Sequence, residues 1–465
     1  MLDASHLALA YLLAEWVIRV AMIVFIPLRR PPEAARSWLL LVMFMPVPAL
    51  ILYRLIGRPR FPQWRHERFR HSIACRDAVA KALPAPASSA SAVETLALHL
   101  GGFPACMGNR LRLMTEYDAA IEALVAEIGR AERHIHLQTY IFASDDTGRE
   151  VTRALGAAVA RGVTVRVLVD ALGSRPWARQ SMAMLRKAGV DAHLILPIRF
   201  ASLRRARSDL RNHRKLSLFD GQLAFIGSQN IVDRDFKPGI VNDELVARIE
   251  GPVAAACEAV FASDWYLETE EELAVPAVPL PCGPAVLQAM PSGPDYGTPG
   301  YERLLVDLVH QAKHDVIIVS PYLIPDEALL TALKNAVARN VTVDLVVSNV
   351  VDQYLVGLAQ RSYYDELLRS GVRIYRYRRK LLHAKSVTVD ESVGIIGSSN
   401  ADIRSFMLNA EISLIMHAGE QVGALKAIHR HYMGNSDPLD LAVWRARPGA
   451  SRLWENLARL VSPLL

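Results

Sequence analysis

Cysteine is scarce in this chain of 465 residues, and its four copies lie far apart. None belongs to a Cys-x-x-Cys pair, so the spacing gives no support to a zinc site or to a disulfide framework. We therefore expect free thiols in a reducing compartment. The four residues are Cys75, Cys106, Cys257 and Cys282.

Charged residues are also few for an ordinary soluble enzyme, at 22%, while hydrophobic residues make up 51% of the chain. This composition excludes a disordered protein, and the length is about three times that of a usual domain, so several domains are expected. The formal net charge of +6 favours an anionic partner, such as phospholipid, nucleic acid or a phosphate ester. Charge alone does not choose among these three.

The excess of apolar residues lies near the N-terminus, at 7–28 and 38–56. Each stretch approaches the roughly 20 residues that cross a hydrocarbon core, so residues 1–60 are predicted to form a membrane anchor of two spanning helices. Glu15 and Arg19 argue against a cleaved signal peptide, but on a helix they share a face and neutralise each other. Pro46 in the second stretch leaves a kinked or re-entrant hairpin as the alternative.

Arginines follow the second apolar stretch, with six between residues 54 and 70 against one glutamate. Because positive residues are retained in the cytoplasm, this bias places everything after residue 57 on the cytoplasmic side. Residues 61–109 are predicted as a basic juxtamembrane segment and linker, whose arginines and Trp64 would lie against anionic headgroups. The alternative is that these arginines serve only as a topology signal.

The rest of the chain consists of two similar halves, residues 110–274 and 300–465. A Pro-rich stretch at 275–299 divides them and has the composition of a linker. Ala-Arg-Gly-Val-Thr-Val at 160–165 matches Ala-Arg-Asn-Val-Thr-Val at 338–343, which indicates a duplicated unit.

Both halves predict the same order of elements. Helix-like stretches at 148–160 and 326–338 precede β-branched runs at 163–169 and 341–347. This alternation predicts an α/β fold, with a mixed sheet flanked by helices in each half. Pairing of the halves about a pseudo-two-fold axis would bring equivalent positions together at one seam.

The strongest signal is a motif that occurs once in each half. A histidine is followed two residues later by a lysine and five residues after that by an aspartate, and then by Gly-Ser-x-Asn and a glutamate. The members are His213, Lys215, Asp220, Ser228, Asn230 and Glu244 in the first half, and His383, Lys385, Asp390, Ser398, Asn400 and Glu411 in the second.

This double motif resembles the signature of the phospholipase D superfamily, over nearly all of residues 110–465. Tyr-Leu-Ile-Pro-Asp-Glu at 322–327 and the two-segment anchor make the chain similar to bacterial cardiolipin synthases in particular. The resemblance implies two phospholipase D-like domains behind a transmembrane hairpin in a bacterial cytoplasmic membrane. It also implies an enzyme that converts two phosphatidylglycerol molecules to cardiolipin and glycerol, with His213 as nucleophile because the first motif attacks in relatives.

The residue types of the motif supply what phosphodiester cleavage needs. In a strand, residues two apart share a face, so each histidine lies on the same face as its lysine. One neutral histidine can attack phosphorus to form a phosphohistidine while the other, protonated, donates to the leaving oxygen. The lysines, the asparagines and the hydroxyls of Ser228 and Ser398 are expected to bind the phosphoryl oxygens. Because side chains supply the positive charge, we expect no metal and no cofactor.

The carboxylates of the motif allow two interpretations each. Glu244 and Glu411 either accept a hydrogen bond from the far ring nitrogen of each histidine or support the fold. Asp220 and Asp390 belong to the signature that the resemblance marks as catalytic. The Gly221 that follows Asp220, and the Glu-Ser that follows Asp390, favour a turn instead.

Basic runs precede both motifs, and we expect them to rim the pocket and attract anionic headgroups, with a solvated face as the alternative. They are Arg199, Arg204, Arg205, Arg207 and Arg211, then Arg373, Arg376, Arg378, Arg379 and Lys380.

Two rival functions use the same residues. A hydrolase would pass the phosphatidyl group to water and release phosphatidic acid, and a non-catalytic scaffold would only bind lipid. The intact motif in both halves argues against the scaffold. The anchor favours phosphatidylglycerol, cardiolipin and an anionic membrane as partners over nucleic acid. Phosphatidylethanolamine as second lipid and the oligomeric state stay open.

Overall fold

The computed structural model describes residues 4–30, 32–57, 61–86, 90–197, 209–297 and 299–460. The chain divides into two compact units. We call Met1–Arg60 with Ala206–Asp209 the helical unit, and Phe61–Arg205 with Leu210–Leu465 the sheet unit.

The helical unit consists of three helices, α1 (Ala4–Phe25), α2 (Pro32–Phe44) and α3 (Pro46–Ile56). Among the described residues, only α1 is long and apolar enough to span a bilayer. The second predicted segment is not one continuous helix, because a residue before proline is pushed out of helical geometry. Met45 has φ −139°, and the apolar stretch splits there into α2 and α3. This break fits the kinked-hairpin alternative. Whether this segment crosses the bilayer stays a prediction.

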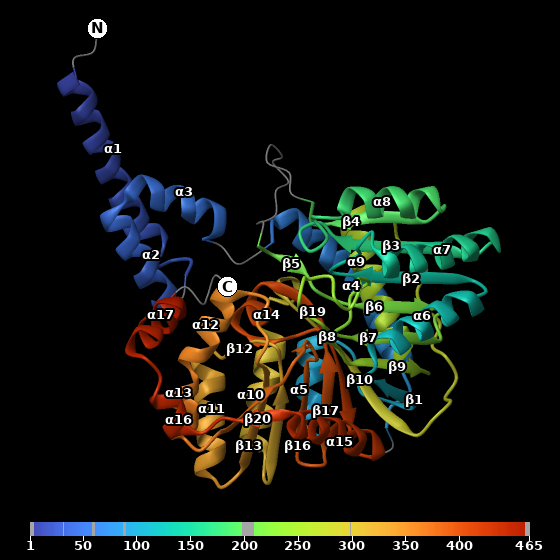
Figure 1. Ribbon diagram of the computed structural model, residues 1–465. Helices are drawn as coiled ribbons and strands as arrows, with labels where there is room; N and C mark the ends of the chain where they lie inside the picture. The colour runs from blue at the N-terminus through green and yellow to red at the C-terminus, as the bar shows by residue number, and fades with distance from the viewer. Residues whose placement is uncertain are drawn as a thin grey trace. The chain divides into compact units, whose positions relative to one another are not determined.

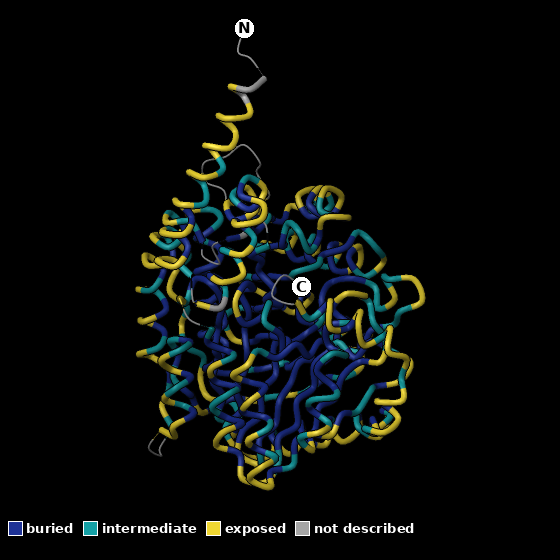
Figure 2. Tube along the Cα trace, turned by 90° about the vertical axis from the view of Figure 1, so that its left-hand side faces the viewer, coloured by how far each residue is buried: buried dark blue, intermediate teal, exposed yellow. Residues whose placement is uncertain are grey.

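The predicted ion pair within α1 is present. Arg19 Nη2 lies 3.1 Å from Glu15 Oε2, one helical turn away. Most other side chains of α1 are exposed (Figure 2), which is the pattern of a helix whose apolar surface is covered by lipid rather than by protein. The three helices share a small core made of Met22, Ile26, Ala35, Val42, Ala49 and Tyr53.

The sheet unit is built around one continuous mixed sheet whose two halves have the same strand order (Figure 1). The first half runs β4-β3-β2-β6-β7-β9-β1 and the second β14-β13-β11-β16-β17-β19-β10, with β20 (Ser436–Pro438) at the outer edge of β14. β1 and β10 pair antiparallel at the centre and join the halves. The duplicated α/β fold predicted from the sequence is confirmed.

The strands of the first half are β1 (Cys106–Met114), β2 (His134–Thr139), β3 (Thr164–Asp170), β4 (Asp191–Ile195), β6 (Leu216–Phe219), β7 (Leu223–Gly227) and β9 (Val246–Glu250). Those of the second are β10 (Ala285–Ser292), β11 (Asp315–Val319), β13 (Thr342–Ser348), β14 (Arg373–Tyr377), β16 (Ser386–Val389), β17 (Val393–Gly397) and β19 (Asn409–His417). Five two-residue strands complete the set: β5 (Arg211–Asn212), β8 (Asn242–Asp243), β12 (Leu323–Ile324), β15 (Leu381–Leu382) and β18 (Ala401–Asp402).

Helices cover both faces of the sheet and bury its apolar side chains in two cores, one per half. Those of the first half and its N-terminal extension are α4 (Gln63–Ala82), α5 (Ala92–Gly101), α6 (Tyr117–Arg130), α7 (Asp146–Ala160), α8 (Ala178–Lys187) and α9 (Val253–Thr269). Those of the second are α10 (Gly300–Gln311), α11 (Glu327–Ala338), α12 (Tyr354–Ser362), α13 (Tyr364–Arg369), α14 (Ile403–Met407), α15 (Glu420–Gly434), α16 (Leu441–Arg445) and α17 (Gly449–Leu460), after a 3₁₀ turn at Pro294–Tyr296.

The two predicted linkers are corrected by the structure. Residues 275–299 contain β10, which is buried and pairs with both β1 and β19 at the middle of the sheet. Residues 61–109 contain α4, α5 and the start of β1. Most prolines of these segments lie outside the helices and strands, and Pro291 lies near the end of β10, opposite Ile412 of β19. Composition alone therefore suggested linkers where the chain forms core elements.

Two of the basic residues after the anchor, Arg65 and Arg68, also differ from the expectation. Arg65 is 2% exposed and pairs with Glu268, at 2.7 Å, and with Asp295, at 3.7 Å. Arg68 donates to the carbonyl of Leu267, at 2.9 Å. These arginines fix α4 against α9 and its C-terminal extension, so they are internal supports of the fold and do not lie on headgroups.

Candidate active site

The two motifs meet because each one crosses to the opposite half. β5, just before His213, pairs in parallel with β19 of the second half, and the His213 amide donates to the Ala410 carbonyl at 2.8 Å. In the same way β15 pairs with β8 of the first half, and the His383 amide donates to the Asp243 carbonyl at 2.7 Å. This exchange of strands brings both motifs together at the boundary between the two halves, as the predicted pseudo-two-fold pairing requires. We call the region around His213 and His383 the seam.

Each histidine is held by the glutamate of the other half. Nδ1 of His213 lies 3.0 Å from Glu411, and Nδ1 of His383 lies 2.8 Å from Glu244. An ionised carboxylate only accepts hydrogen bonds, so each Nδ1 carries a proton. Nε2 then presents a lone pair when the ring is neutral and donates a proton when the ring is charged. The sequence predicted that the glutamates orient the rings, but it did not predict that the pairs are crossed.

Burial controls the protonation of these pairs. It lowers the pKa of His213 to about 4, in spite of the attraction of Glu411, and it also lowers the pKa of His383. Burial alone would raise the pKa of both glutamates, but the histidine and lysine beside each carboxylate hold that pKa below its ordinary value. His213 is therefore neutral at physiological pH, as a nucleophile must be.

The two lysines lie in the same buried seam. Lys215 and Lys385 are 4% and 2% exposed, and each ammonium donates to the backbone carbonyl of its own histidine. Burial lowers the pKa of Lys215 to about 7 and that of Lys385 to about 8, and each lysine lowers the pKa of the histidine in the opposite half. In their protonated form these buried ammonium groups are suited to binding a phosphoryl group.

The asparagines of the motif also lie in the buried seam. Oδ1 of Asn230 accepts the backbone N–H of Ile141 at 3.0 Å, which leaves the NH₂ group as the donor for a ligand. Oδ1 of Asn400 is buried and has no hydrogen-bond partner among the described residues. Only the NH₂ groups can bind phosphoryl oxygens, because an amide oxygen accepts hydrogen bonds, so this role stays a prediction for both asparagines.

The serines of the motif have a different role from the one expected. The Ser228 hydroxyl donates to the Leu245 carbonyl at 3.2 Å, and the Ser398 hydroxyl donates to Glu411 Oε2 at 2.5 Å. A hydroxyl has a single proton, so neither is free to donate to phosphate as well. Their contacts position the glutamates and the strands that carry them.

The glycine before each serine permits a close crossing of strands. A Cβ on Gly227 would lie 2.3 Å from the Leu245 carbonyl oxygen, and one on Gly397 would lie 2.3 Å from that of Ile412. Larger residues would push β7 away from β9, and β17 from β19. The repeated Gly-Ser pair therefore brings each glutamate-bearing strand close to the histidine of the other half.

The aspartates of the motif are turn residues, as their sequence context favoured. Asp220 and Asp390 have positive φ, at 54° and 52°. The Asp220 carboxylate accepts the backbone N–H groups of residues 132, 133 and 134, and Asp390 accepts those of 313, 314 and 315. Each one fixes the entry to a central strand, β2 or β11, so the expectation of direct catalytic participation is corrected.

Tyr140 at the end of β2 belongs to the site, although the motif analysis did not select it. Its ring centre lies 4.8 Å from that of His213 and 5.4 Å from the Lys215 ammonium. Tyr322 occupies the matching place in the second half, and the match of Tyr-Ile-Phe with Tyr-Leu-Ile in the two repeats was the signal that could have identified both.

Asp352 was also missed, because nothing in the repeat marks it. It accepts hydrogen bonds from Tyr322 Oη and from Lys237 Nζ, each at 2.5 Å. Its negative charge interacts with His383, which favours the protonated form of that ring.

The two basic runs differ in burial within the described residues. Arg211 is 2% exposed and pairs with Asp170, at 3.4 Å. Arg373 pairs with Asp344, and Lys380 with Asp243. Arg211 is therefore internal, whereas the Arg373 and Lys380 side chains are 54% and 41% exposed, so a basic rim formed by the second run stays a prediction. Arg199, Arg204, Arg205 and Arg207 lie outside the described residues.

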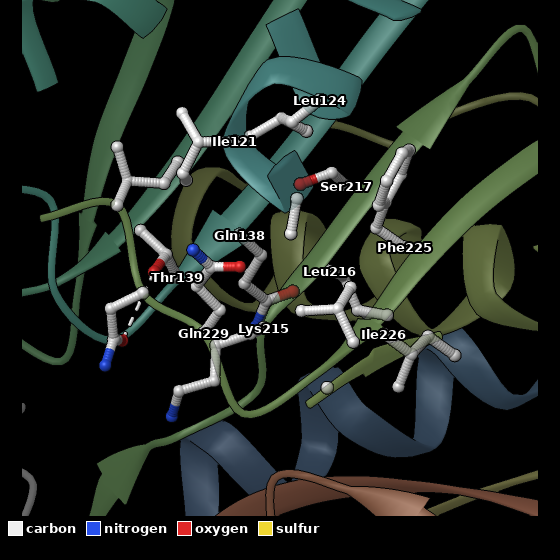
Figure 3. A pocket seen from close by; sticks show the side chains of 15 residues that line it. Ile121, Leu124, Gln138, Thr139, Lys215, Leu216, Ser217, Phe225, Ile226 and Gln229 are labelled. Atoms are coloured by element: carbon white, nitrogen blue, oxygen red, sulfur yellow. Dashed lines mark hydrogen bonds between the residues drawn. The ribbon is translucent and has the colours of Figure 1, made fainter. Parts of the chain in front are cut away.

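A small cavity of about 40 Å³ lies in the first half beside Lys215. Figure 3 shows Gln138, Thr139 and Gln229 near the lysine, and apolar side chains from α6, β6 and β7 around the rest. This space holds little more than one water molecule, so it does not accommodate a lipid.

One group of side chains within the described residues has the composition of a metal site. His134 and His136 on β2 and Glu258 on α9 have ligand atoms within 4.8 Å of one another. His136 and Glu258 already share a hydrogen bond, and the Arg166 guanidinium lies 3.5 Å from the other nitrogen of His136. A nearby fixed cation opposes a metal ion, so we interpret the group as an internal hydrogen-bond network.

The sequence matches a known family in both halves. The family model described as "Cardiolipin synthase, PLD-like domain" matches residues 124–265 and 305–432. Two similar curated proteins are cardiolipin synthase A of Citrobacter koseri and of Salmonella arizonae. Each is 32% identical over 481 aligned residues, which cover 98% of this chain and 98% of the relative.

Solved structures share the fold at lower sequence identity. A phosphatidylserine synthase from Haemophilus influenzae superposes with a TM-score of 0.60 at 14% identity, covering 80% of this chain and all of that one. A polyphosphate kinase from Porphyromonas gingivalis superposes with a TM-score of 0.51 at 15% identity, covering 77% of this chain and 53% of that one.

Proposed function

Because this chain belongs to the cardiolipin synthase family of phospholipase D-like phosphotransferases, we propose that it joins two phosphatidylglycerol molecules into cardiolipin and releases glycerol. The family acts on phospholipids in membranes, and α1 offers one apolar helix of spanning length. The observation that supports the reaction most strongly is the crossed pairing of each histidine with the opposite glutamate, which gives one buried site with two Nε2 atoms and two ammonium groups.

In the first step, Nε2 of neutral His213 attacks the phosphorus of one phosphatidylglycerol. The bond between phosphorus and the terminal glycerol oxygen breaks, and protonated His383 gives its Nε2 proton to that oxygen. Glycerol leaves, and the phosphatidyl group stays on His213. Lys215, Lys385 and the asparagine amides stabilise the charge on the equatorial oxygens.

In the second step, the free hydroxyl of another phosphatidylglycerol enters the place that glycerol left. His383, now neutral, takes the hydroxyl proton while the oxygen attacks phosphorus and the bond to His213 breaks. Cardiolipin leaves, and both rings return to their starting protonation states. One phosphodiester is exchanged for another, so the reaction needs neither a nucleotide nor an oxidant.

The orientation in the membrane is inferred from the distribution of positively charged residues. We infer an enzyme of a bacterial cytoplasmic membrane that enters the bilayer with α1 and with the broken α2–α3 segment, and that works on the cytoplasmic face. The arginines that follow the anchor support this orientation.

The test is incubation of the purified full-length protein with labelled phosphatidylglycerol as the only lipid. Cardiolipin and glycerol should form in equal amounts, and a His213→Ala variant should form neither. Phosphatidic acid in place of cardiolipin would show that water is the acceptor and that the enzyme is a phospholipase. Product that forms only after phosphatidylethanolamine is added would identify that lipid as the second substrate.

A further inference from the structure

Exposed apolar side chains concentrate on one group of helices in the sheet unit. Of the twelve large hydrophobic residues that are exposed in its described part, seven lie on α12, α16 and α17. α17 packs along α12, and α16 packs on α13 (Figure 1). The seven are Tyr354, Leu355, Val443, Leu453, Trp454, Leu457 and Leu460, and we call this surface the α12–α17 face.

On α17 apolar side chains face outward and a carboxylate is buried, which is the reverse of the usual arrangement on a surface helix of a water-soluble protein. Leu453, Leu457 and Leu460 share one side of the helix by their spacing, and they are 59%, 43% and 77% exposed. Trp454, beside them, is 61% exposed, whereas Glu455 is buried against the body of the protein. A helix that turns leucines and a tryptophan outward presents them to something other than water.

The charges around this apolar side fit an anionic lipid surface. Residues 441–460 hold four arginines and one glutamate. Arg452 is exposed and lies on the flank of α17, and Arg445 and Arg459 pair with carboxylates of α13. An apolar face with leucine and tryptophan, bordered by arginines, is the pattern of a helix lying in the plane of a membrane interface.

The α12–α17 face continues to the active site. Tyr354 and Leu355 are 75% and 52% exposed in the first turn of α12. They directly follow Gln353, which donates to Tyr322 Oη, and Asp352, whose charge interacts with His383. A membrane that contacts this turn therefore brings its phosphates to the level of the second-half histidine.

We propose that the α12–α17 face is a second membrane contact of the enzyme, in which α17 lies in the headgroup layer of an anionic bilayer. This contact is additional to the spanning helix, and it holds the mouth of the seam at the depth of the phospholipid phosphates. This proposal depends on the proposed function in one respect: it assumes that the bilayer in contact with the face is the one that supplies the substrate.

The test places a fluorophore on this face in the full-length enzyme. The partly exposed thiols are first removed by Cys75→Ser and Cys282→Ser, since the other two cysteines are buried. A nitrobenzoxadiazole label is then attached at Leu457→Cys, or for control at Ala424→Cys, an exposed position on α15. Both proteins are reconstituted in phosphatidylglycerol-containing nanodiscs, with and without brominated acyl chains.

The Leu457→Cys label should emit at shorter wavelength than the control and lose most of its intensity in brominated lipid, while the Ala424→Cys label should be unaffected. A blue-shifted label that bromine does not quench would mean that protein, either the helical unit or a second copy of the chain, covers the face, and would overturn the proposal. Equal quenching at both positions would overturn it too. Quenching can be measured without any reaction. A protein whose label is quenched but which forms no cardiolipin would therefore contradict the proposed reaction and leave the membrane contact supported.

Discussion

The two halves of the sheet unit share a strand order and a motif, yet they surround their histidines differently. In the first half, the carboxylate of Asp170 is occupied by Arg211 and by backbone amides of residues 172, 173 and 212. In the second half, Asp352 interacts with His383 and is shared with Lys237 and Tyr322. The two histidines therefore differ in the charged groups around them, and this difference is what the proposed division of roles rests on.

Loss of either histidine has the largest expected effect. His213→Ala and His383→Ala should each lower kcat by at least about 10³-fold, because neither nucleophile nor proton donor has a substitute in the seam. A phosphatidyl ester of nitrophenol separates the two roles, since nitrophenolate leaves without a proton. Release of nitrophenol should return in His383→Ala and stay absent in His213→Ala. Recovery in the opposite variant would reverse the assignment.

The glutamates test the crossing of the pairs. Removing the charge of Glu244 lowers the pKa of His383, so in Glu244→Gln the alkaline limb of the pH–rate profile should move to lower pH. Glu411→Gln should lower kcat by about 10- to 100-fold without moving the alkaline limb of kcat, since it disorients the neutral His213 while bound phosphate keeps the lysines protonated. Because Glu411 also raises the pKa of Lys215, the alkaline limb of kcat/KM should move to lower pH. If Glu411→Gln moved the alkaline limb of kcat as Glu244→Gln does, the crossed arrangement would be contradicted.

The lysines predict a further loss of activity at alkaline pH. A lysine binds phosphate only while protonated, and burial has lowered the pKa of Lys215 to about 7 and that of Lys385 to about 8. kcat/KM should therefore fall as the pH rises from 7 to 9. Bound phosphate raises both pKa values, so kcat should fall only at higher pH. A kcat/KM that stays constant to pH 9 would exclude this behaviour.

Variants of Asp352 and Lys237 should move the pH profile in opposite directions, which tests the difference between the surroundings of the two histidines. Asp352→Asn removes a negative charge near His383 and should move the alkaline limb of kcat to lower pH, with a loss of a few-fold at pH 8. Lys237→Met leaves Asp352 unneutralised and should move the limb to higher pH. Shifts in the same direction would mean that Asp352 acts through structure and not through charge.

The aspartates of the motif should have the smallest effect on chemistry. Asp220→Ala and Asp390→Ala each remove an acceptor of three backbone N–H groups, which costs about 1–3 kcal/mol of stability. We expect a lower unfolding temperature in scanning calorimetry, and a KM close to that of the parent when activity is normalised to folded enzyme. A wild-type unfolding temperature with a large fall in kcat would place these carboxylates in the reaction.

Much of the site was readable from spacing. Two copies of His-x-Lys and of Gly-Ser-x-Asn predicted that His213 and His383 act together, and the βαβ alternation predicted α7, β3, α11 and β13 within one or two residues. These signals are local in sequence or repeat at a fixed interval. Residue type and spacing are sufficient to interpret them.

The features that could not be predicted from the sequence are those that depend on tertiary contacts. The glutamate that holds each histidine is decided by the pairing of β5 with β19 and of β15 with β8, between segments about 200 and 140 residues apart. Arg65 resembled a headgroup-binding residue until its partners Glu268 and Asp295 were in place. In each case a short polar segment has several possible partners, and the packed fold selects one.

The most direct test of the central claim is to identify which histidine carries the phosphatidyl group. The full-length enzyme would be mixed with labelled phosphatidylglycerol, quenched in base, where a phosphohistidine survives, and mapped by peptide mass spectrometry. The division of roles predicts the adduct on His213 in the parent and none in His213→Ala. An adduct on His383 would contradict it.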